Sequence, residues 1–396
     1  MFIEILLACL AGVAFGIITG LAPGIHINLV ATAILSLMPL VMLNPLFAVI
    51  IIISIAVTHI FLDFIPSTFL GVPTADNSLS LLPSQELLLQ GKSYESIFLS
   101  IVGCLLGIVL IMIFTPFLVL VTKPIYTSIT NFIPYILIFS LLFLLFKEKN
   151  RIWAAIIIIL SGILGIFSFK LSVNEILFPM FSGLFGISSL IVSINYNAIL
   201  PEQFISKIEL NKFKTMTIAV KGFLASLLVG FLPGMGSAQA SMIATSFSKD
   251  NERKDYIILV SSINSIVLVM AIIALFTINK ARNGAIAIIS EMFGIISIYH
   301  FILFISLVLF ISGIAAIITI SISKMFMNVI KKINYKKLSC FIIFLIAVLV
   351  LIISGLTGFL VLIVASAIGL MPILKKVSRN SLMASLIIPI IIYYLA

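Results

Sequence analysis

The sequence is poor in charge. Only 9% of its 396 residues are Asp, Glu, Lys or Arg, whereas 62% are hydrophobic. An average soluble domain carries roughly 25% charged residues, so this composition excludes a water-soluble globular protein. Apolar runs of about 17 to 25 residues recur along the chain, and each is long enough to cross a hydrocarbon layer of roughly 30 Å as a helix. The composition predicts a polytopic membrane protein without a soluble domain.

Cysteine is also scarce, and the three cysteines have no metal-binding or disulfide spacing. Cys9, Cys104 and Cys340 all lie inside apolar runs, without a CxxC or His-linked pattern. This excludes a disulfide framework and gives no support to a metal site. We therefore expect no cofactor other than a coupling ion, which is a sodium ion or a proton.

Enzyme signatures are missing or weak. The sequence has no HExxH, no Walker motif and no glycine-rich nucleotide fingerprint, so ATP-driven pumping and nucleotide chemistry are unsupported. The segment Gly186-Ile-Ser188-Ser189, together with His300, is the best candidate for an intramembrane serine hydrolase. It is a short motif in a chain rich in glycine and serine, so we predict that the protein is not an enzyme.

Positive charge is concentrated in a few connectors. The net charge of +10 does not indicate nucleic-acid binding, because 19 of the 23 Lys and Arg residues lie in short segments that can share one side of a membrane. The positive-inside rule places these segments in the cytoplasm and both termini outside a plasma membrane. The cytoplasmic segments are 63–93, 147–151, 197–255, 323–337 and 375–379, and the remaining cations are Lys123, Lys170, Lys280 and Arg282.

The apolar runs predict an all-α fold with about ten transmembrane spans and two re-entrant Pro-Gly hairpins. Residues 1–196 contain a hairpin at 5–41 and five spans, and residues 197–396 contain a hairpin at 217–247 and five more. Because five is odd, the second half is inserted upside down relative to the first, which defines two inverted repeats. The predicted spans are 46–62, 94–121, 132–146, 151–169, 174–196, 256–278, 299–322, 338–353, 356–374 and 380–396.

The repeat is visible in the residues of the two hairpins. The segment 16–24, GIITGLAPG, aligns with the segment 226–234, SLLVGFLPG, at an offset of 210 residues. These segments hold the only two Pro-Gly pairs of the chain. Their equivalent positions indicate paired broken helices, which in transporters mark the binding site.

Each Pro-Gly break is a candidate anion site. The helix that follows the break begins with backbone N–H groups without intrahelical partners, and these favour a carboxylate or phosphate. In inverted halves the two tips can meet near the midplane and hold one small anionic substrate. The alternative is that the glycines only allow close helix packing. The candidate substrate-binding residues are Pro23, Gly24, His26, Asn28, Pro233, Gly234, Gly236, Ser237 and Gln239.

A second polar segment follows the first span. His59 and Asp63 are four residues apart and share a helix face, so they are candidates for a proton relay or for a structural hydrogen-bonded pair at a helix end. Thr58, Asp76 and Asn77 supply further oxygen ligands for a sodium ion. These five residues are candidates for the coupling ion or proton, and both ions stay open.

The comparable segment of the second half carries Asn264, Lys280, Arg282 and Asn283. Arg282 can clamp an anionic group bidentately with Lys280 adding charge, or both can contact lipid headgroups. We include Arg282 among the substrate-binding candidates, and Asn264 and Asn283 among the coupling-ion candidates.

These motifs resemble the large membrane subunit (TctA) of tripartite tricarboxylate transporters, especially its shorter archaeal-type members. The similarity covers nearly the whole chain and is most specific at Gly20-Leu-Ala-Pro23-Gly24 and Gly230-Phe-Leu-Pro233-Gly234, with 69–74 (FLGVPT) resembling a further family segment. The resemblance implies a secondary transporter for di- or tricarboxylate-like anions, driven by a sodium or proton gradient. It also raises a separate binding protein and a small membrane subunit as partners.

Two further alternatives stay open. Paired hairpins that hold an anion also suit a translocase for polyprenyl-phosphate lipid carriers, which would need a lateral opening to membrane lipids. Small-residue stripes serve association between chains as well as folding within one, so a homo-oligomer is compatible with the sequence.

Overall fold

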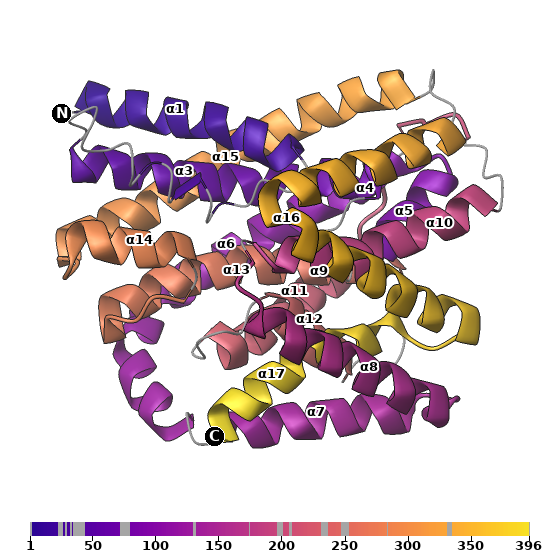
Figure 1. The fold of residues 1–396 in the computed structure, drawn as a ribbon. Helices are drawn as coiled ribbons and strands as arrows, with labels where there is room; N and C mark the ends of the chain where they lie inside the picture. Colours follow the sequence, from indigo (N-terminus) through magenta and orange to yellow (C-terminus); the bar gives the residue numbers. More distant parts are fainter. Residues whose placement is uncertain are drawn as a thin grey trace.

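The structure is a computed structural model, and within its described residues the chain is helical with no strand. Figure 1 shows the helices as one layered bundle, with the N-terminus at the upper left beside the start of α3 and the C-terminus beside α7. The described residues are 2–22, 27, 30–31, 34, 44–71, 80–129, 132–173, 175–195, 201–205, 208–230, 237–246, 253–282, 284–330 and 335–395.

Helices make up both halves of the chain. The first half contains α1 (Phe2–Leu21), α3 (Pro45–Leu62), α4 (Phe64–Leu70), α5 (Leu81–Leu89), α6 (Ser93–Ile129), α7 (Ile133–Lys147), α8 (Arg151–Lys170), α9 (Leu177–Phe181), the π-helix η2 (Ser182–Ile187) and α10 (Ser188–Asn195). The second half contains α11 (Lys212–Gly230), α12 (Ser237–Ser246), α13 (Arg253–Ile278), α14 (Gly284–Phe293), α15 (Ile298–Ile330), α16 (Tyr335–Lys375), the 3₁₀-helix η3 (Arg379–Met383) and α17 (Ala384–Leu395).

Several helices begin where the sequence provides a cap. The side chain of Asn44 accepts a hydrogen bond from the Leu46 N–H at 2.9 Å, and Pro45 occupies the first helical position, where a missing N–H costs nothing. Asn150 caps α8 in the same way through the Trp153 N–H. The caps fix the start of two membrane helices next to short connectors.

Seven helical stretches of the described chain are long and apolar enough to cross a membrane, and three shorter apolar helices accompany them. A helix occupies each of the ten ranges predicted as spans, with Ser339–Lys375 covering two of them, whereas the long stretch Phe2–Leu21 lies in the first predicted re-entrant hairpin, 5–41. The long stretches are Phe2–Leu21, Pro45–Leu70, Ser93–Ser128, Arg151–Lys170, Arg253–Ile278, Ile298–Asn328 and Ser339–Lys375, and the shorter helices are Pro134–Phe146, Leu177–Val192 and Arg379–Leu395.

Two elements differ from their predicted bounds for identifiable reasons. α6 continues to Ile129 through Pro116 and Pro124, whereas the predicted span ends at residue 121. Proline is tolerated in membrane helices, and here each proline removes only one backbone donor, the partner of the Met112 or the Leu120 carbonyl. Within α16, Gly355 has φ 65° and ψ −168°, so the helix is interrupted between the two predicted spans 338–353 and 356–374.

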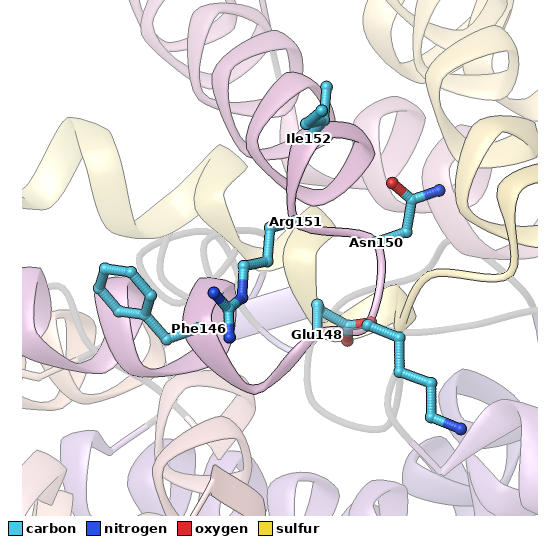
Figure 2. Close-up of a pocket in the computed structure, with 6 residues that line it drawn as sticks. Phe146, Glu148, Asn150, Arg151 and Ile152 are labelled. Atoms are coloured by element: carbon cyan, nitrogen blue, oxygen red, sulfur yellow. The ribbon is translucent and has the colours of Figure 1, made fainter.

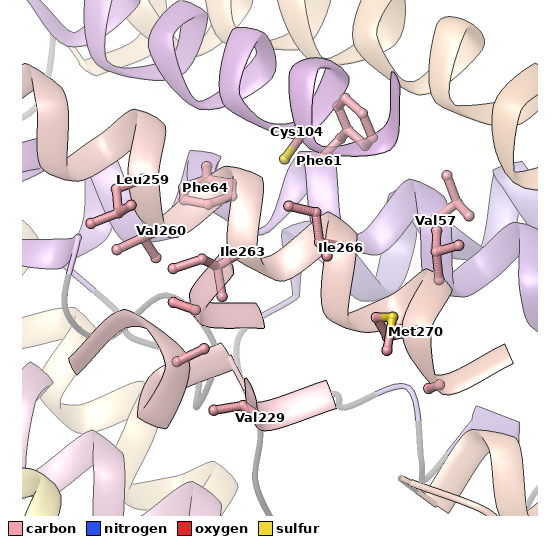
Figure 3. Packing of buried hydrophobic residues seen from close by; sticks show 14 of the residues in the cluster. Val57, Phe61, Phe64, Cys104, Val229, Leu259, Val260, Ile263, Ile266 and Met270 are labelled. Carbon is pink, nitrogen blue, oxygen red and sulfur yellow. The ribbon is translucent and has the colours of Figure 1, made fainter. Parts of the chain in front are cut away.

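The centre of the fold is α13, which is almost entirely enclosed by other helices. Figure 3 shows Ile263 and Ile266 of α13 among Phe61, Cys104 and Val229, which come from α3, α6 and α11. All five side chains are buried. An apolar helix without a polar face is expected only where protein or lipid surrounds it on all sides, and here the surroundings of α13 are mainly protein.

Glycines let the central helices approach closely. A Cβ atom at Gly103 or Gly107 of α6 would lie 2.5 Å from the carbonyl oxygen of Ile258 or Ser262 of α13, closer than real Cβ atoms come to another atom. The Ser265 hydroxyl uses this proximity to donate to the Cys104 carbonyl at 2.9 Å. Small residues that bring helix backbones together are the usual basis of helix association in lipid.

The helices form two groups that pack mainly within themselves. The first, the α3–α13 body, comprises α1, α3 to α6 and α11 to α15, and the second, the α8–α16 body, comprises α7 to α10 with η2, α16, η3 and α17. The principal contacts between the bodies are those of α12 with α7 and η3, and of α4 with α16. In Figure 1 the helices α7, α8 and α17 lie together at the bottom, and α1, α3 and α14 at the upper left.

The two halves of the sequence exchange helices within each body. In the α3–α13 body, α6 of the first half packs on α13 of the second, while α15 of the second half packs on α3 of the first. In the α8–α16 body, α17 packs on α8, and η2 packs on α16. Neither half of the chain therefore forms one of the two bodies alone.

We predict that Gly107→Ala destabilises the protein by about 1–3 kcal/mol, because the new methyl group would overlap backbone and side-chain atoms of α13. The matched control is Gly313→Ala in α15, where no atom lies within 4 Å of the new Cβ. This control should be neutral or stabilising by up to about 1 kcal/mol, since alanine favours a helix more than glycine. Thermal unfolding of both variants in one detergent measures the difference, and equal stability would contradict the close approach of α6 and α13.

Candidate functional site

Most residues predicted at the hairpin tips lie outside the described residues. These are Pro23, Gly24, His26, Asn28, Pro233, Gly234 and Gly236, and the coupling-ion candidates Asp76, Asn77 and Asn283 lie outside them as well. Of Gln239 the structure describes only the backbone, which belongs to α12. The described geometry therefore concerns the helices that lead into and out of the two Pro-Gly segments.

The helices on both sides of the second Pro-Gly segment pack against each other. α11 ends at Gly230, α12 begins at Ser237, and both contact α13. Ser237 is buried, and its carbonyl accepts a hydrogen bond from the Ser241 hydroxyl at 2.7 Å. The first turn of α12 thus lies inside the protein, with a polar residue directly after the Pro-Gly segment.

Equivalent residues hold the two leading helices in place. On α1, a Cβ at Gly20 would lie 2.8 Å from the Leu62 Cβ of α3, and on α11 a Cβ at Gly230 would lie 3.1 Å from the Met270 Cβ of α13. The pairs correspond by offsets of 210 residues in the first helix and 208 in the second. Each of the two glycines precedes its Pro-Gly by three residues, so the two helices that lead into the Pro-Gly segments pack on α3 and α13 in a similar way.

A buried polar contact joins α1 to α3 near the first Pro-Gly segment. His59 Nδ1 lies 3.2 Å from the Thr19 hydroxyl, which also donates to the Gly16 carbonyl at 3.2 Å. His59 and Thr19 are both buried. A histidine that bridges two helices can be structural and can also carry a proton.

The neighbours of His59 on α3 are the other predicted coupling residues. Thr58 is fully buried, and its hydroxyl has no hydrogen-bond partner within the part of the chain that the structure describes. Asp63 is 3% exposed at the junction of α3 and α4, within electrostatic range of Cys104 on α6. The structure therefore brings Thr58, His59 and Asp63 to one interior region. Asn264 is also buried, on the neighbouring helix α13.

Arg282 lies elsewhere, at the opposite end of α13 from Lys254. The Arg282 guanidinium and the Lys280 ammonium lie 5.5 Å and 4.9 Å from the centre of the Tyr126 ring at the end of α6, and Lys280 donates to the Tyr126 hydroxyl at 2.9 Å. Burial lowers the pKa of Arg282 to about 10, so this side chain stays charged at neutral pH. The cations form a separate positive cluster.

Connectors that were predicted to share one side do contact each other. Lys254 pairs with the buried Glu95 at 2.5 Å, and Arg253 pairs with Glu86. These pairs join the start of α13 to α5 and to the start of α6. Arg253 and Lys254 belong to the predicted cytoplasmic segment 197–255, and in the structure they begin α13 and bind residues of the first half of the chain.

A second set of contacts joins the connectors 147–151 and 375–379. The Glu148 carboxylate accepts a hydrogen bond from the Ser378 N–H at 3.2 Å, and Lys375 lies 4.1 Å from the Trp153 ring. Figure 2 shows the hollow at this turn, where Arg151 lies beside Phe146. The hollow is lined by the α7–α8 connector and the residues beside it, including Lys149 and Arg151, and we do not assign a substrate to it.

The sequence analysis missed Arg379 as a candidate site residue. It was counted among connector cations, but its guanidinium points into the π-helix η2 and donates to the hydroxyl groups of Ser188 and Ser189 at 2.6 Å each. The small motif Gly186-Ile-Ser188-Ser189 was the available signal. Its serines bind an arginine, while His300 lies 2.9 Å from Ser297, so no serine–histidine pair forms between them.

Comparisons with known proteins point to one family. The model of the tripartite tricarboxylate transporter TctA family matches residues 6–384. The chain is also similar to "Uncharacterized protein MJ1079" of Methanocaldococcus jannaschii, with 34% identity over 415 residues that cover 98% of this chain and 99% of that protein. No solved structure matches the chain significantly.

We predict that Thr19→Val destabilises the protein by about 1–2 kcal/mol, because it leaves the buried His59 ring without its bond to α1. The matched control is Thr122→Val, where the hydroxyl bonds only to the Leu118 carbonyl of its own helix. Thermal unfolding should show a smaller loss for this control. Equal losses would contradict a contribution of the His59–Thr19 contact to stability.

Proposed function

The chain belongs to the tripartite tricarboxylate transporter TctA family, and from this premise we propose that it is a secondary active transporter of a di- or tricarboxylate-like anion. It is a multi-pass membrane protein of a transporter family and not an enzyme. Family members act with other subunits. The proposed mechanism is alternating access in the plasma membrane, coupled to a sodium or proton gradient, with a small membrane subunit and a binding protein as candidate partners.

The observation that carries this proposal is the equivalent packing before the two Pro-Gly segments. Gly20 meets Leu62, and Gly230 meets Met270, at corresponding positions of two central helices that contact each other. This supports two repeats, each with a hairpin that returns at the Pro-Gly. The substrate would then lie between the hairpin tips, where the free N–H groups of two helix starts attract its carboxylates.

The ion pairs and the cation cluster support inverted insertion of the repeats. The pairs Lys254–Glu95 and Arg253–Glu86 hold the start of α13 against the start of α6 and against α5 at one end, and the Lys280–Tyr126 contact joins the far ends of α13 and α6. In the proposed topology of ten spans and two re-entrant hairpins, the first end faces the cytoplasm. Both termini then lie outside.

The coupling ion would bind next to the first hairpin. The Thr58 hydroxyl has no hydrogen-bond partner among the described residues, and Asp63 supplies a buried carboxyl group five residues later. A sodium ion would use these oxygens together with carbonyl groups of the broken helix, whereas a proton would use His59 and Asp63. Since α3 packs on α1, either ion would be linked to the position of the first hairpin.

Alternating access would follow from displacement of the α8–α16 body against the α3–α13 body. Among the described residues the two bodies meet mainly at α12, the second arm of the predicted second hairpin, and at α4, which follows α3. The Asn380 side-chain amide of η3 donates a hydrogen bond to the Thr245 hydroxyl of α12 at 3.4 Å, which joins the two bodies. Because the described residues of the two bodies pack mainly within their own body, this boundary suits a rigid-body motion.

We predict that a covalent link between Thr245→Cys and Asn380→Cys, in a background without the native cysteines, stops transport in proteoliposomes. A short bifunctional thiol reagent forms the link, and a reductant should restore transport if the linker contains a disulfide. The control pair Glu86→Cys and Arg253→Cys lies within the α3–α13 body, so its link should leave transport intact. Full transport by the linked Thr245–Asn380 protein would contradict motion at this boundary.

We predict that citrate or succinate raises the melting temperature of the purified protein, because a ligand that binds only the folded state stabilises it by roughly 2.7 kcal/mol at 100 times its Kd. Each anion is tested with sodium and with potassium at two pH values. A shift that requires sodium and is lost in Asp63→Asn identifies the coupling ion. Gly24→Leu and Gly234→Leu variants that still fold should lose the shift, and no response to any carboxylate would contradict the proposed cargo.

A further inference from the structure

The Arg379 guanidinium contacts several polar groups of one neighbouring segment, residues 184–189. Its Nη1 donates to Ser189 Oγ at 2.6 Å, and its Nη2 lies within hydrogen-bond distance of the Leu184 and Phe185 carbonyls, both at 3.0 Å, and of Ser188 Oγ at 2.6 Å. The guanidinium also stands 5.4 Å from the centre of the Phe185 ring. One side chain of the second half thus holds one turn of a π-helix of the first half.

The π-helix explains why acceptors are available here. In η2 the backbone bonds run to the fifth residue instead of the fourth, which leaves carbonyl groups of the turn open to other donors. Short π-helical segments inside α-helices are frequent at functional sites. A neutral donor would satisfy these carbonyls equally well. The open carbonyls therefore do not explain why the residue at position 379 is positively charged.

The charge of Arg379 is not balanced by the part of the chain that the structure describes. Within it no Asp or Glu forms an ion pair with Arg379, and the Nε group has no hydrogen-bond acceptor. A cation between membrane helices is costly, and such residues usually mark a substrate or ion path. The three acceptors near Nη2 share two hydrogens, and the Ser188 and Ser189 hydroxyls themselves donate to the Leu184 and Phe185 carbonyls. These carbonyls therefore keep a donor when the guanidinium turns to a stronger acceptor.

The position of Arg379 connects it to the second hairpin. The next residue, Asn380, contacts Thr245 of α12, and η3 as a whole packs against α12. α12 is the helix that begins directly after the second Pro-Gly segment. Arg379 therefore belongs to the face of the α8–α16 body that meets this hairpin.

We propose that Arg379 binds a carboxylate group of the transported anion at the junction of η3 and α12, a role that rests on the proposed function. The planar guanidinium matches a carboxylate in geometry and charge, and Nε together with one terminal nitrogen presents the edge that such pairs use. The substrate would contact Arg379 on one body and the hairpin on the other. A substrate without a carboxylate would lack this contact.

The test compares citrate and succinate binding to purified wild type, Arg379→Gln and Arg379→Lys by calorimetry. Loss of a charge-assisted pair should weaken binding about ten- to hundred-fold in Arg379→Gln, and Arg379→Lys should fall between this variant and wild type. The control is Lys375→Gln, four residues before Arg379. The Lys375 ammonium lies over the Trp153 ring, so this variant should bind the anions as wild type does.

A second measurement does not depend on a variant that folds. Phenylglyoxal modifies arginine, and mass spectrometry of wild-type protein should show that citrate protects Arg379 while the modification of Arg253 stays unchanged. A purely structural arginine would show no such protection. If Arg379→Gln binds citrate with the affinity of wild type, or if citrate does not protect Arg379, the role of Arg379 is overturned and the transporter proposal stays intact. If wild type binds no carboxylate, both proposals are overturned.

Discussion

The close approach of helices through small residues is the constraint on which the rest of this structure depends. In lipid the hydrophobic effect does not drive helices together, so packing contacts and interhelical hydrogen bonds must do so. Gly103 and Gly107 let α6 reach the backbone of α13, and Ser265 then bonds across the interface to Cys104. The same principle operates in the other body, where a Cβ at Gly183 of η2 would lie 2.7 Å from the Leu362 carbonyl of α16.

These contacts join different halves of the chain, and this has a mechanical consequence. If each half folded onto itself, the protein would consist of two units joined by one connector. Because α6 packs on α13 and α17 packs on α8, each body contains helices from both halves. The chain passes between the bodies at 129–133, 196–211 and 330–335, so three connectors must accommodate any displacement. Within a body the glycine contacts leave no room for sliding, and motion is confined to the boundary.

The sequence predicts much of the helical fold, because hydropathy depends on each segment alone. The ten predicted ranges contain helices, and the interruption at Gly355 separates the last two long ones as expected. The sequence cannot predict which helices exchange partners, since the glycine stripes of α6 and α8 are equally suited to several neighbours. The extension of α6 from residue 121 to Ile129 was also not predicted.

The candidate site was predicted less completely than the fold. His59 and Asp63 were recognised because their spacing places them on one helix face, and the structure adds Thr19, which comes from another helix. Arg379 was missed because a cation near the end of an apolar run is usually part of a cytoplasmic connector. Arg379 contacts a π-helix almost 200 residues earlier in the chain, and no local sequence pattern predicts such a contact.

The placement of a cation on one body and of a hairpin on the other bears on how loading and movement are linked. On the proposed arrangement, the Arg379 charge is not neutralised when no substrate is bound. Moving this charge along the apolar interface between the two bodies is unfavourable. A bound carboxylate neutralises the guanidinium and also contacts the hairpin, so the loaded protein meets a smaller electrostatic barrier. The anion thus has a differential free energy of interaction with the moving states, which is what coupling requires. The coupling ion near Thr58 and Asp63 would act in the same way on the first hairpin, at the opposite repeat.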